Sequence, residues 1–175
     1  MELFVGLDFP AAVSQELKRV QRALRVFDPS GAYEPKENFH LTLHYIGDVA
    51  SPDALTERLL KVNRKPFELT LHELGMFDIV GGNVVWVNVR AEPRLHDLHQ
   101  RISGILAELS TGKKQYSFDP HISIAYECRA NISDVFSSCT VAAVTFAVSR
   151  FYLYEVSDLP EGMRFRKLND FELKG

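Results

Sequence analysis

Two tetrapeptides with the same pattern, one in each half of the chain, constrain the fold more than any other feature of this sequence. Each has histidine first, a hydroxyl residue third, and aliphatic residues second and fourth: His40-Leu41-Thr42-Leu43 and His121-Ile122-Ser123-Ile124. Because successive side chains of a β-strand point to opposite faces, each tetrapeptide predicts a strand with one polar and one apolar face. The histidine and the hydroxyl of each strand should lie about 7 Å apart on the polar face.

The segments around these strands predict an α+β domain. Apolar residues recur at helical spacing in three segments and at alternate positions in most of the others. The helical segments are 13–27, 55–62 and 95–109, and the strand-like segments are 2–9, 40–47, 67–72, 84–89, 121–126, 141–146, 149–156 and 165–173. In both halves a long helix, a loop with proline and a histidine strand follow one another. We therefore expect one domain over residues 1–175, with mostly antiparallel sheets and helices outside.

The charge balance limits the partners of this chain. Its 20 Lys+Arg and 23 Asp+Glu give a formal net charge of -3. A protein that coats long nucleic acid neutralises many phosphates with a basic surface, so this balance argues against binding to long duplexes. No basic leader opens the sequence, and no run approaches the roughly 20 apolar residues of a membrane span. We expect a cytoplasmic protein with no membrane partner, whose two cysteines, Cys128 and Cys139, are reduced.

Two histidine strands that face each other would suit the chemistry of a phosphodiester. One imidazole can activate an attacking oxygen while the other protonates the leaving oxygen. Histidine fits both tasks because its ordinary pKa, about 6.5, lets one ring be neutral and the other protonated near neutral pH. The hydroxyls of Thr42 and Ser123 can donate hydrogen bonds to the non-bridging oxygens. These groups need no metal and no other cofactor, and we predict none.

Several other side chains are weaker candidates. His40 and His44 resemble an HxxxH metal pair, but on a strand they stand about 13 Å apart, too far to share one zinc ion. His44 shares the predicted polar face of His40 and is a candidate substrate contact, although a structural role fits it better. Aromatic residues that could stack a terminal base, each with core packing as the alternative, are Phe9, Tyr33, Phe39, Trp86 and Tyr126. Lysines on loops that could meet RNA phosphates are Lys36, Lys113 and Lys114.

The sequence also resembles the 2H phosphoesterases, and among them the RNA 2',3'-cyclic phosphodiesterases, also called 2'-5' RNA ligases. The similarity spans nearly the whole chain. It rests on the opening 3–10, the first histidine motif 37–47, residues 66–77 with the strand 85–87, the second histidine motif 120–124, and the tail 153–173. The resemblance implies two pseudo-symmetric lobes that line a central cleft. It also implies hydrolysis of RNA 2',3'-cyclic phosphate ends to 2'-phosphomonoesters, together with 2'-5' RNA ligase activity.

The same resemblance implies roles for individual residues. His40 would be the proton donor to the 3' oxygen, His121 would be the proton acceptor that activates water, and Thr42 and Ser123 would bind the phosphate. Members of this group often carry arginine five residues after the second histidine, where this chain has Tyr126. The nearest cation is Arg129. Tyr126 and Arg129 are therefore candidate substrate contacts, together with His44 and Phe9.

The expected partners are RNA ends or small nucleotides that carry a 2',3'-cyclic phosphate, and we expect a monomer. Two alternatives stay open at this point. The same histidines could act on another phosphodiester, such as a 2'-5' linked oligonucleotide or the cyclic phosphate of an ADP-ribose derivative. The cleft could instead hold RNA ends without turnover, although a pure binder has no need of two titrating histidines.

Overall fold

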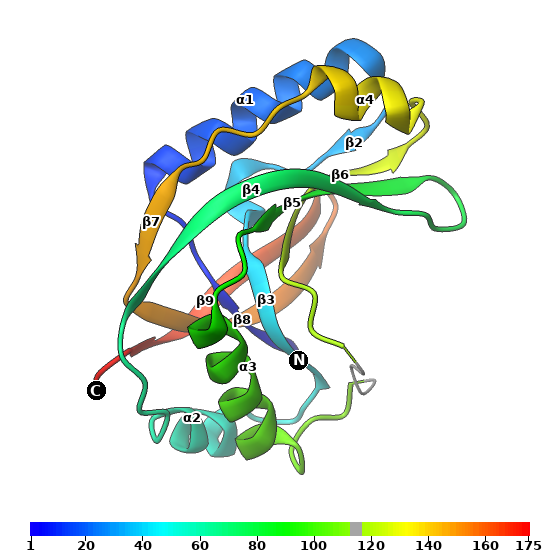
Figure 1. Cartoon of the computed structure of the whole chain (residues 1–175). Helices are drawn as coiled ribbons and strands as arrows, with labels where there is room; N and C mark the ends of the chain where they lie inside the picture. Colours follow the sequence, from blue (N-terminus) through cyan, green and yellow to red (C-terminus); the bar gives the residue numbers. More distant parts are fainter. Residues whose placement is uncertain (113–116) are drawn as a thin grey trace.

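The computed structural model describes residues 1–112 and 117–175, which form two antiparallel sheets with helices around them (Figure 1). One sheet has the strand order β3-β1-β8-β9, and the other has the order β2-β6-β5-β4-β7. The strands are β1 (Glu2–Leu7), β2 (Ala32–Tyr33), β3 (Leu41–Asp48), β4 (Phe67–Phe77), β5 (Asn83–Val89), β6 (His121–Cys128), β7 (Thr145–Val148), β8 (Arg150–Leu159) and β9 (Gly162–Glu172). The helices are α1 (Ala11–Phe27), α2 (Asp53–Leu59), α3 (Pro93–Leu106) and α4 (Ile132–Ser138), with a 3₁₀ turn at Lys36–Asn38.

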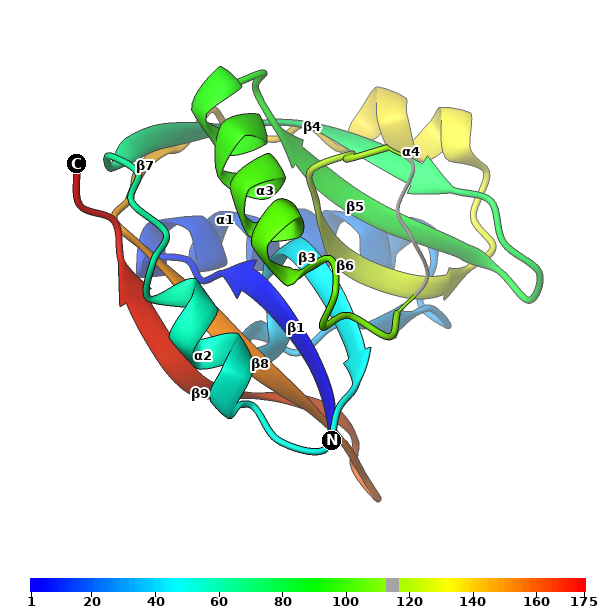
Figure 2. The same cartoon turned by 90° about the horizontal axis from the view of Figure 1, so that it is seen from below.

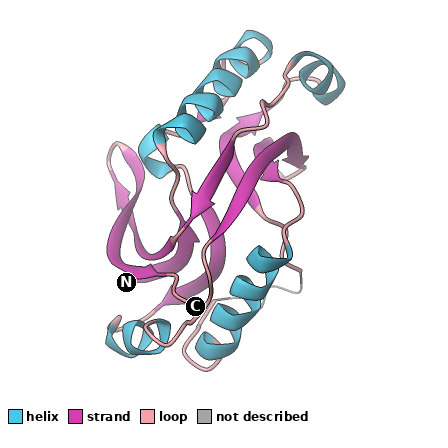
Figure 3. Ribbon diagram, turned by 60° about the vertical axis from the view of Figure 1, so that its left-hand side comes forward, coloured by secondary structure: helices cyan, strands magenta, loops and turns pink. Residues whose placement is uncertain are grey.

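The predicted α+β class with antiparallel sheets and outer helices is confirmed. The helices form two pairs on opposite sides of the strands, α1 with α4 and α2 with α3 (Figure 3). Helix α1 follows β1 of the first sheet but packs against β6 of the second sheet. Helix α3 follows β5 of the second sheet but packs against β3 of the first, and Figure 2 shows it running across the molecule. Each long helix thus supports the histidine strand of the other sheet.

Local sequence signals explain the two long helices. Helix α1 begins after Pro10 and buries one stripe of side chains, Val13, Leu17, Val20 and Leu24. Helix α3 begins with Pro93, whose missing N–H costs nothing in the first turn, and the Glu92 side chain accepts a hydrogen bond from the Arg94 N–H. It buries Leu95, Leu98, Ile102 and Leu106. Both helices lie where the apolar spacing predicted them.

The apolar residues of both sheets and of the long helices form one buried cluster, which also contains the free cysteines Cys128 and Cys139. Three short elements differ from the sequence expectation, and one of them is the two-residue strand β2, which was not predicted. Residues 141–144 are not part of a strand, because β7 begins at Thr145, and the seven-residue helix α4 was not predicted. Helix α4 buries Val135 but leaves Phe136 exposed, so its apolar residues form no clear stripe. Within the described residues, no helix has the length and apolar character needed to cross a membrane.

Each histidine strand carries a β-bulge three residues after the histidine. In the first sheet Thr42 pairs with Gly6 and His44 pairs with Val5, so Leu43 is the extra residue. In the second sheet Ser123 pairs with Trp86 and Ala125 pairs with Val85, so Ile124 is the extra residue. A bulge shifts the alternation of side chains by one position. The prediction that His44 shares a face with His40 and Thr42 is therefore wrong.

Candidate active site

The two histidines precede or open the bulged strands and are anchored in the same way. The Nδ1 atom of His40 lies 2.7 Å from the carbonyl oxygen of Asn38, and that of His121 lies 2.7 Å from the carbonyl oxygen of Asp119. Because a carbonyl oxygen only accepts hydrogen bonds, each Nδ1 must carry the proton. The Nε2 atom of each ring then accepts a proton when the ring is neutral and donates one when it is charged.

The fold brings the two histidines together from different sheets. Strands β3 and β6 are in contact, although they belong to separate sheets. Burial lowers the pKa of His40, the hydrogen bond to Asn38 opposes this effect, and the charge of His121 lowers the pKa further. The titration of one imidazole therefore depends on the charge of the other, as expected for neighbouring rings.

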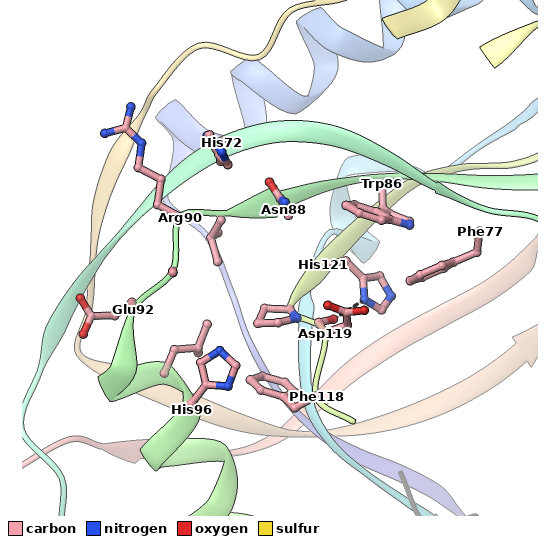
Figure 4. Close-up of a pocket in the computed structure, with 14 residues that line it drawn as sticks. His72, Phe77, Trp86, Asn88, Arg90, Glu92, His96, Phe118, Asp119 and His121 are labelled. Carbon is pink, nitrogen blue, oxygen red and sulfur yellow. Dashed lines mark hydrogen bonds between the residues drawn. The ribbon is translucent and has the colours of Figure 1, made fainter. Parts of the chain in front are cut away.

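Aromatic rings surround both imidazoles. The ring centroids of Phe4 and Phe165 each lie 4.7 Å from that of His40, and the Phe165 ring is edge-on to it. On the other side Phe77 meets His121 edge-on at 4.9 Å, and the Trp86 centroid lies 6.1 Å away (Figure 4). The sequence pointed to Trp86 but not to the three phenylalanines, which lie in other strands and share no local motif with the histidines.

A pocket lies beside each histidine. The pocket at His121 has a volume of about 350 Å³ and lies between β4, β5, the start of α3 and residues 118–121 (Figure 4). Trp86 lines it, and the Nε1 atom of this indole is buried without a hydrogen-bond partner among the described residues. The pocket at His40 has a volume of about 400 Å³ and is lined by Lys36, Phe165 and Lys167, among others. Both histidines therefore have space beside them for part of a ligand.

The hydroxyl residues and Tyr126 lie on the histidine side of the strands. Thr42 and Ser123 are both partly exposed, two residues beyond His40 and His121. Tyr126 follows the bulge at Ile124, and its hydroxyl lies beside the side chains of Ser123 and Glu34. Burial and the nearby Glu34 carboxylate raise the pKa of Tyr126, so its hydroxyl stays protonated and can donate.

The structure does not bring the other three candidate contacts to this site. Both ring nitrogens of His44 are occupied, Nδ1 at 3.0 Å from Ser103 Oγ and Nε2 at 2.8 Å from Ser110 Oγ. Arg129 is exposed beyond the end of β6, and its backbone N–H donates to the carboxylate of Asp28. Phe9 is 9% exposed and packs edge-on against Phe146 in the core. His44 and Phe9 thus make contacts inside the fold, and Arg129 lies at the surface.

The remaining sequence candidates are two aromatic residues and three lysines. Phe39 is buried in the core. The Tyr33 hydroxyl donates a hydrogen bond to the carbonyl oxygen of Asp28, and the Arg25 guanidinium lies over the Tyr33 ring. Lys36 lines the pocket at His40. Lys113 and Lys114 lie outside the described residues. In the described ranges no three His, Cys, Asp or Glu side chains lie close enough to hold a metal ion.

Sequence reasoning missed a buried carboxyl group beside the site. Glu34 is 8% exposed, and its Oε1 atom accepts a hydrogen bond of 2.7 Å from Asn38 Nδ2. Asn38 is the residue whose carbonyl oxygen anchors His40, and its side chain also donates to the Met163 carbonyl. A continuous series of contacts thus joins Ser123, Tyr126, Glu34, Asn38 and His40. Its only sequence signal is the glutamate in the loop before the first histidine motif.

The chain is similar in sequence to known proteins. A family model described as the 2'-5' RNA ligase superfamily matches residues 9–158. An RNA 2',3'-cyclic phosphodiesterase of Escherichia coli K12 is 26% identical over 178 residues, which cover 98% of this chain and 96% of that protein. One of the same name from Aeropyrum pernix is 33% identical over 93 residues, which cover 51% of this chain and 53% of that protein.

The fold is also similar to solved structures. The crystal structure of E. coli LigT in apo form matches with a TM-score of 0.81 and 25% identity, and the alignment covers 99% of this chain and 98% of LigT. A structure of LigT complexed with 3'-AMP matches with a TM-score of 0.80 and 25% identity, with the same coverage.

Proposed function

The chain belongs to the 2'-5' RNA ligase superfamily, and from this premise we propose that it is an RNA 2',3'-cyclic phosphodiesterase. The proposed reaction opens the cyclic phosphate at an RNA end to give a 2'-phosphomonoester. The observation that carries the proposal is the pair of imidazoles from different sheets, each with Nδ1 anchored to a carbonyl oxygen and with Nε2 making no hydrogen bond to the described residues. Full-length similarity to a phosphodiesterase of this name supports it.

In the proposed mechanism the two histidines move one proton each. Neutral His121 takes a proton from water at Nε2 as the water oxygen bonds to phosphorus. The bond between phosphorus and the 3' oxygen breaks, and protonated His40 gives its Nε2 proton to that oxygen. The 2' oxygen stays bonded to phosphorus. If a 5' hydroxyl takes the place of water, the same steps form a 2'-5' linkage. A positioned acid or base of this kind accelerates a reaction about a hundred- to ten-thousandfold.

The bound phosphate favours the protonated form of His40, which the proton donor needs. In the free protein burial lowers the pKa of His40, which favours the neutral ring. An anionic phosphate beside the ring favours the protonated form, so the ring gains its proton together with the substrate. Thr42, Ser123 and the protonated hydroxyl of Tyr126 are the proposed donors to the non-bridging oxygens. These three donors are neutral, so the imidazoles provide most of the stabilisation of the negative charge on the phosphate.

Product analysis with histidine variants tests the proposal. We expect the wild-type protein to convert adenosine 2',3'-cyclic phosphate to the 2'-phosphate, seen by phosphorus NMR, with no effect of a chelator. His40→Gln and His121→Gln should each lower kcat at least a hundredfold, because each removes one proton transfer. Melting temperatures near that of the wild type show that the variants are folded. Full activity in either variant contradicts the assigned roles, and a 3'-phosphate product contradicts the assigned bond cleavage.

A further inference from the structure

Glu34 is fixed in place at the bulge of the second histidine strand. Its backbone N–H donates to the carbonyl oxygen of Ile124, the extra residue of the bulge, at 3.0 Å. The Gln21 side chain donates to the carbonyl oxygens of both Glu34 and Ile124, at 2.8 and 2.7 Å. Gln21 is itself buried, so these hydrogen bonds are shielded from water. The position of Glu34 relative to Ser123, the residue before the bulge, is therefore well determined.

The Glu34 carboxyl group has only partial compensation for its charge. Asn38 donates one hydrogen bond to it, and the Tyr126 hydroxyl lies beside it. Burial raises the pKa of Glu34 above its ordinary value of 4.5, and the charge of Arg164 in β9 opposes this rise. Within the described residues, none of the ion pairs at 4.0 Å or less includes Glu34. The ionised carboxylate is thus a negative charge that two hydrogen-bond donors and a nearby arginine compensate only in part.

This charge lies next to the proposed phosphate position. The Tyr126 hydroxyl is beside both Glu34 and Ser123, so one hydroxyl group separates the carboxylate from a proposed phosphate donor. A negative charge there repels a bound phosphate, and it repels a dianion twice as strongly as a monoanion. The cyclic phosphate of the substrate carries one negative charge. The phosphomonoester product carries almost two near pH 8, because its second pKa is about 6.

We propose that Glu34 makes the site selective for phosphate groups with a single negative charge, so that the cyclic substrate binds well and the dianionic product leaves. The inference rests on the proposed function, since it takes the phosphate to lie at Ser123. For unit charges about 7 Å apart and an effective dielectric constant of about 40, Coulomb's law gives a change of roughly sevenfold in affinity per charge. We expect a measured effect of about three- to tenfold.

Two ligands that differ by one charge test the inference directly. Adenosine 2'-monophosphate and its methyl ester share the nucleoside, but at pH 8 only the first is a dianion. Their dissociation constants are measured by calorimetry for the wild type and for Glu34→Gln, which keeps the shape and removes the charge. We expect Glu34→Gln to tighten binding of the monophosphate about three- to tenfold more than binding of the methyl ester. The control Glu127→Gln removes an exposed charge one residue after Tyr126. It should leave unchanged the ratio of the dissociation constant of the monophosphate to that of the methyl ester.

Further measurements separate charge from structure. Glu34→Asp keeps the charge, so its ratio of dissociation constants should stay close to that of the wild type. A ratio that is equally altered in Glu34→Asp and Glu34→Gln, or unaltered in Glu34→Gln, overturns the inference. If Glu34→Gln does not fold, the two dissociation constants of the wild type still test the inference. Tighter binding of the monophosphate than of the methyl ester at pH 8 also overturns the inference. These binding measurements need no turnover, so absence of hydrolysis would contradict the proposed function alone.

Discussion

At the residue scale, backbone carbonyl oxygens determine which atom of each candidate catalytic imidazole is available. The carbonyls of Asn38 and Asp119 hold the two Nδ1 atoms at the same distance of 2.7 Å. A carboxylate in that position would add a charge that raises the pKa of the ring, whereas a carbonyl fixes the tautomer with a smaller effect. The number of protons that the two imidazoles carry therefore depends on their burial and on the bound ligand.

His44 gives the fold a dependence on pH that is separate from the active site. Burial and the charge of His99 lower the pKa of His44 to about 4. An unfolded chain binds a proton at this residue from about pH 6.5 downward, and the folded protein does not. The contribution of His44 to stability is therefore complete above pH 6.5 and is lost as the pH falls toward 4. Allowing for partial exposure, we expect a loss of about 1–2 kcal/mol.

Urea denaturation at pH 7 and pH 4.5 measures this loss as a difference in the free energy of unfolding. In His44→Gln the side chain does not titrate, so the difference between the two pH values should be smaller than in the wild type by about 1–2 kcal/mol. His72→Gln is the matched control, because the His72 side chain is 49% exposed. Equal pH differences in wild type and His44→Gln would contradict the pKa assigned to His44.

At the element scale, the bulges explain the spacing of the site residues. Alternation alone would place the fifth residue after His121 on the opposite face of the strand. The extra residue Ile124 shifts the alternation, so that Tyr126 lies beside Ser123. In the first sheet the corresponding bulge at Leu43 turns His44 toward α3. A bulge thus adds Tyr126 to the polar face of β6, and the corresponding bulge removes His44 from the polar face of β3.

These details mark the limit of prediction from the sequence. Strand alternation was sufficient to place each histidine and hydroxyl on one face, because only two positions separate them. The bulges have no signature, since Leu43 and Ile124 are ordinary strand residues. Glu34 was missed because it follows a strand of two residues whose partner, β6, lies about ninety positions later in the chain. Contacts of this range depend on the packed fold and leave no periodic signal.

The packing of Trp86 on the neighbouring strand depends on one glycine. Gly75 pairs with Trp86, and a Cβ atom at residue 75 would lie 1.9 Å from the indole ring. We expect Gly75→Ala to displace Trp86 and to lower the free energy of unfolding by about 1–3 kcal/mol. Activity should fall as well, since Trp86 is beside His121. Thermal denaturation and the hydrolysis assay measure the two effects.

Gly104 provides the matched comparison. It lies inside α3, and a Cβ atom there would meet no other atom within 4 Å. Gly104→Ala should therefore raise the free energy of unfolding by about 0.5–1 kcal/mol, because alanine is the better helix former. Equal effects of the two substitutions would show that the close contact with Trp86 does not constrain residue 75.

At the scale of the whole molecule, the site depends on the way the two sheets are joined. Each sheet supplies one histidine and one hydroxyl residue, and each histidine strand rests on the helix that follows a strand of the other sheet. The histidine strand of each sheet thus depends on a helix that follows a strand of the other sheet, so neither half of the site is built from one sheet alone. The apolar cluster that joins both sheets therefore also supports the two strands at which the imidazoles lie.

The net charge of the molecule predicts how much of an RNA chain it holds. With a formal net charge of -3 and neutral donors at the proposed phosphate position, we expect contact with only one or two phosphates. Each phosphate neutralised on a single strand contributes about -0.7 to the slope of log affinity against log salt concentration. For an oligonucleotide with a 2',3'-cyclic phosphate end, kcat/KM should therefore fall only about three- to sevenfold between 50 and 200 mM salt.

The cyclic mononucleotide is the internal control for this measurement, because it carries only the reacting phosphate. If the oligonucleotide and the mononucleotide show similar slopes, binding is confined to the chain end, as the charge balance predicts. An extended track of six phosphates would instead give a slope near -4 and a fall of more than a hundredfold over the same range. Such a slope for the oligonucleotide would contradict recognition of the terminal phosphate alone. It would require a basic surface that the overall charge of this chain does not suggest.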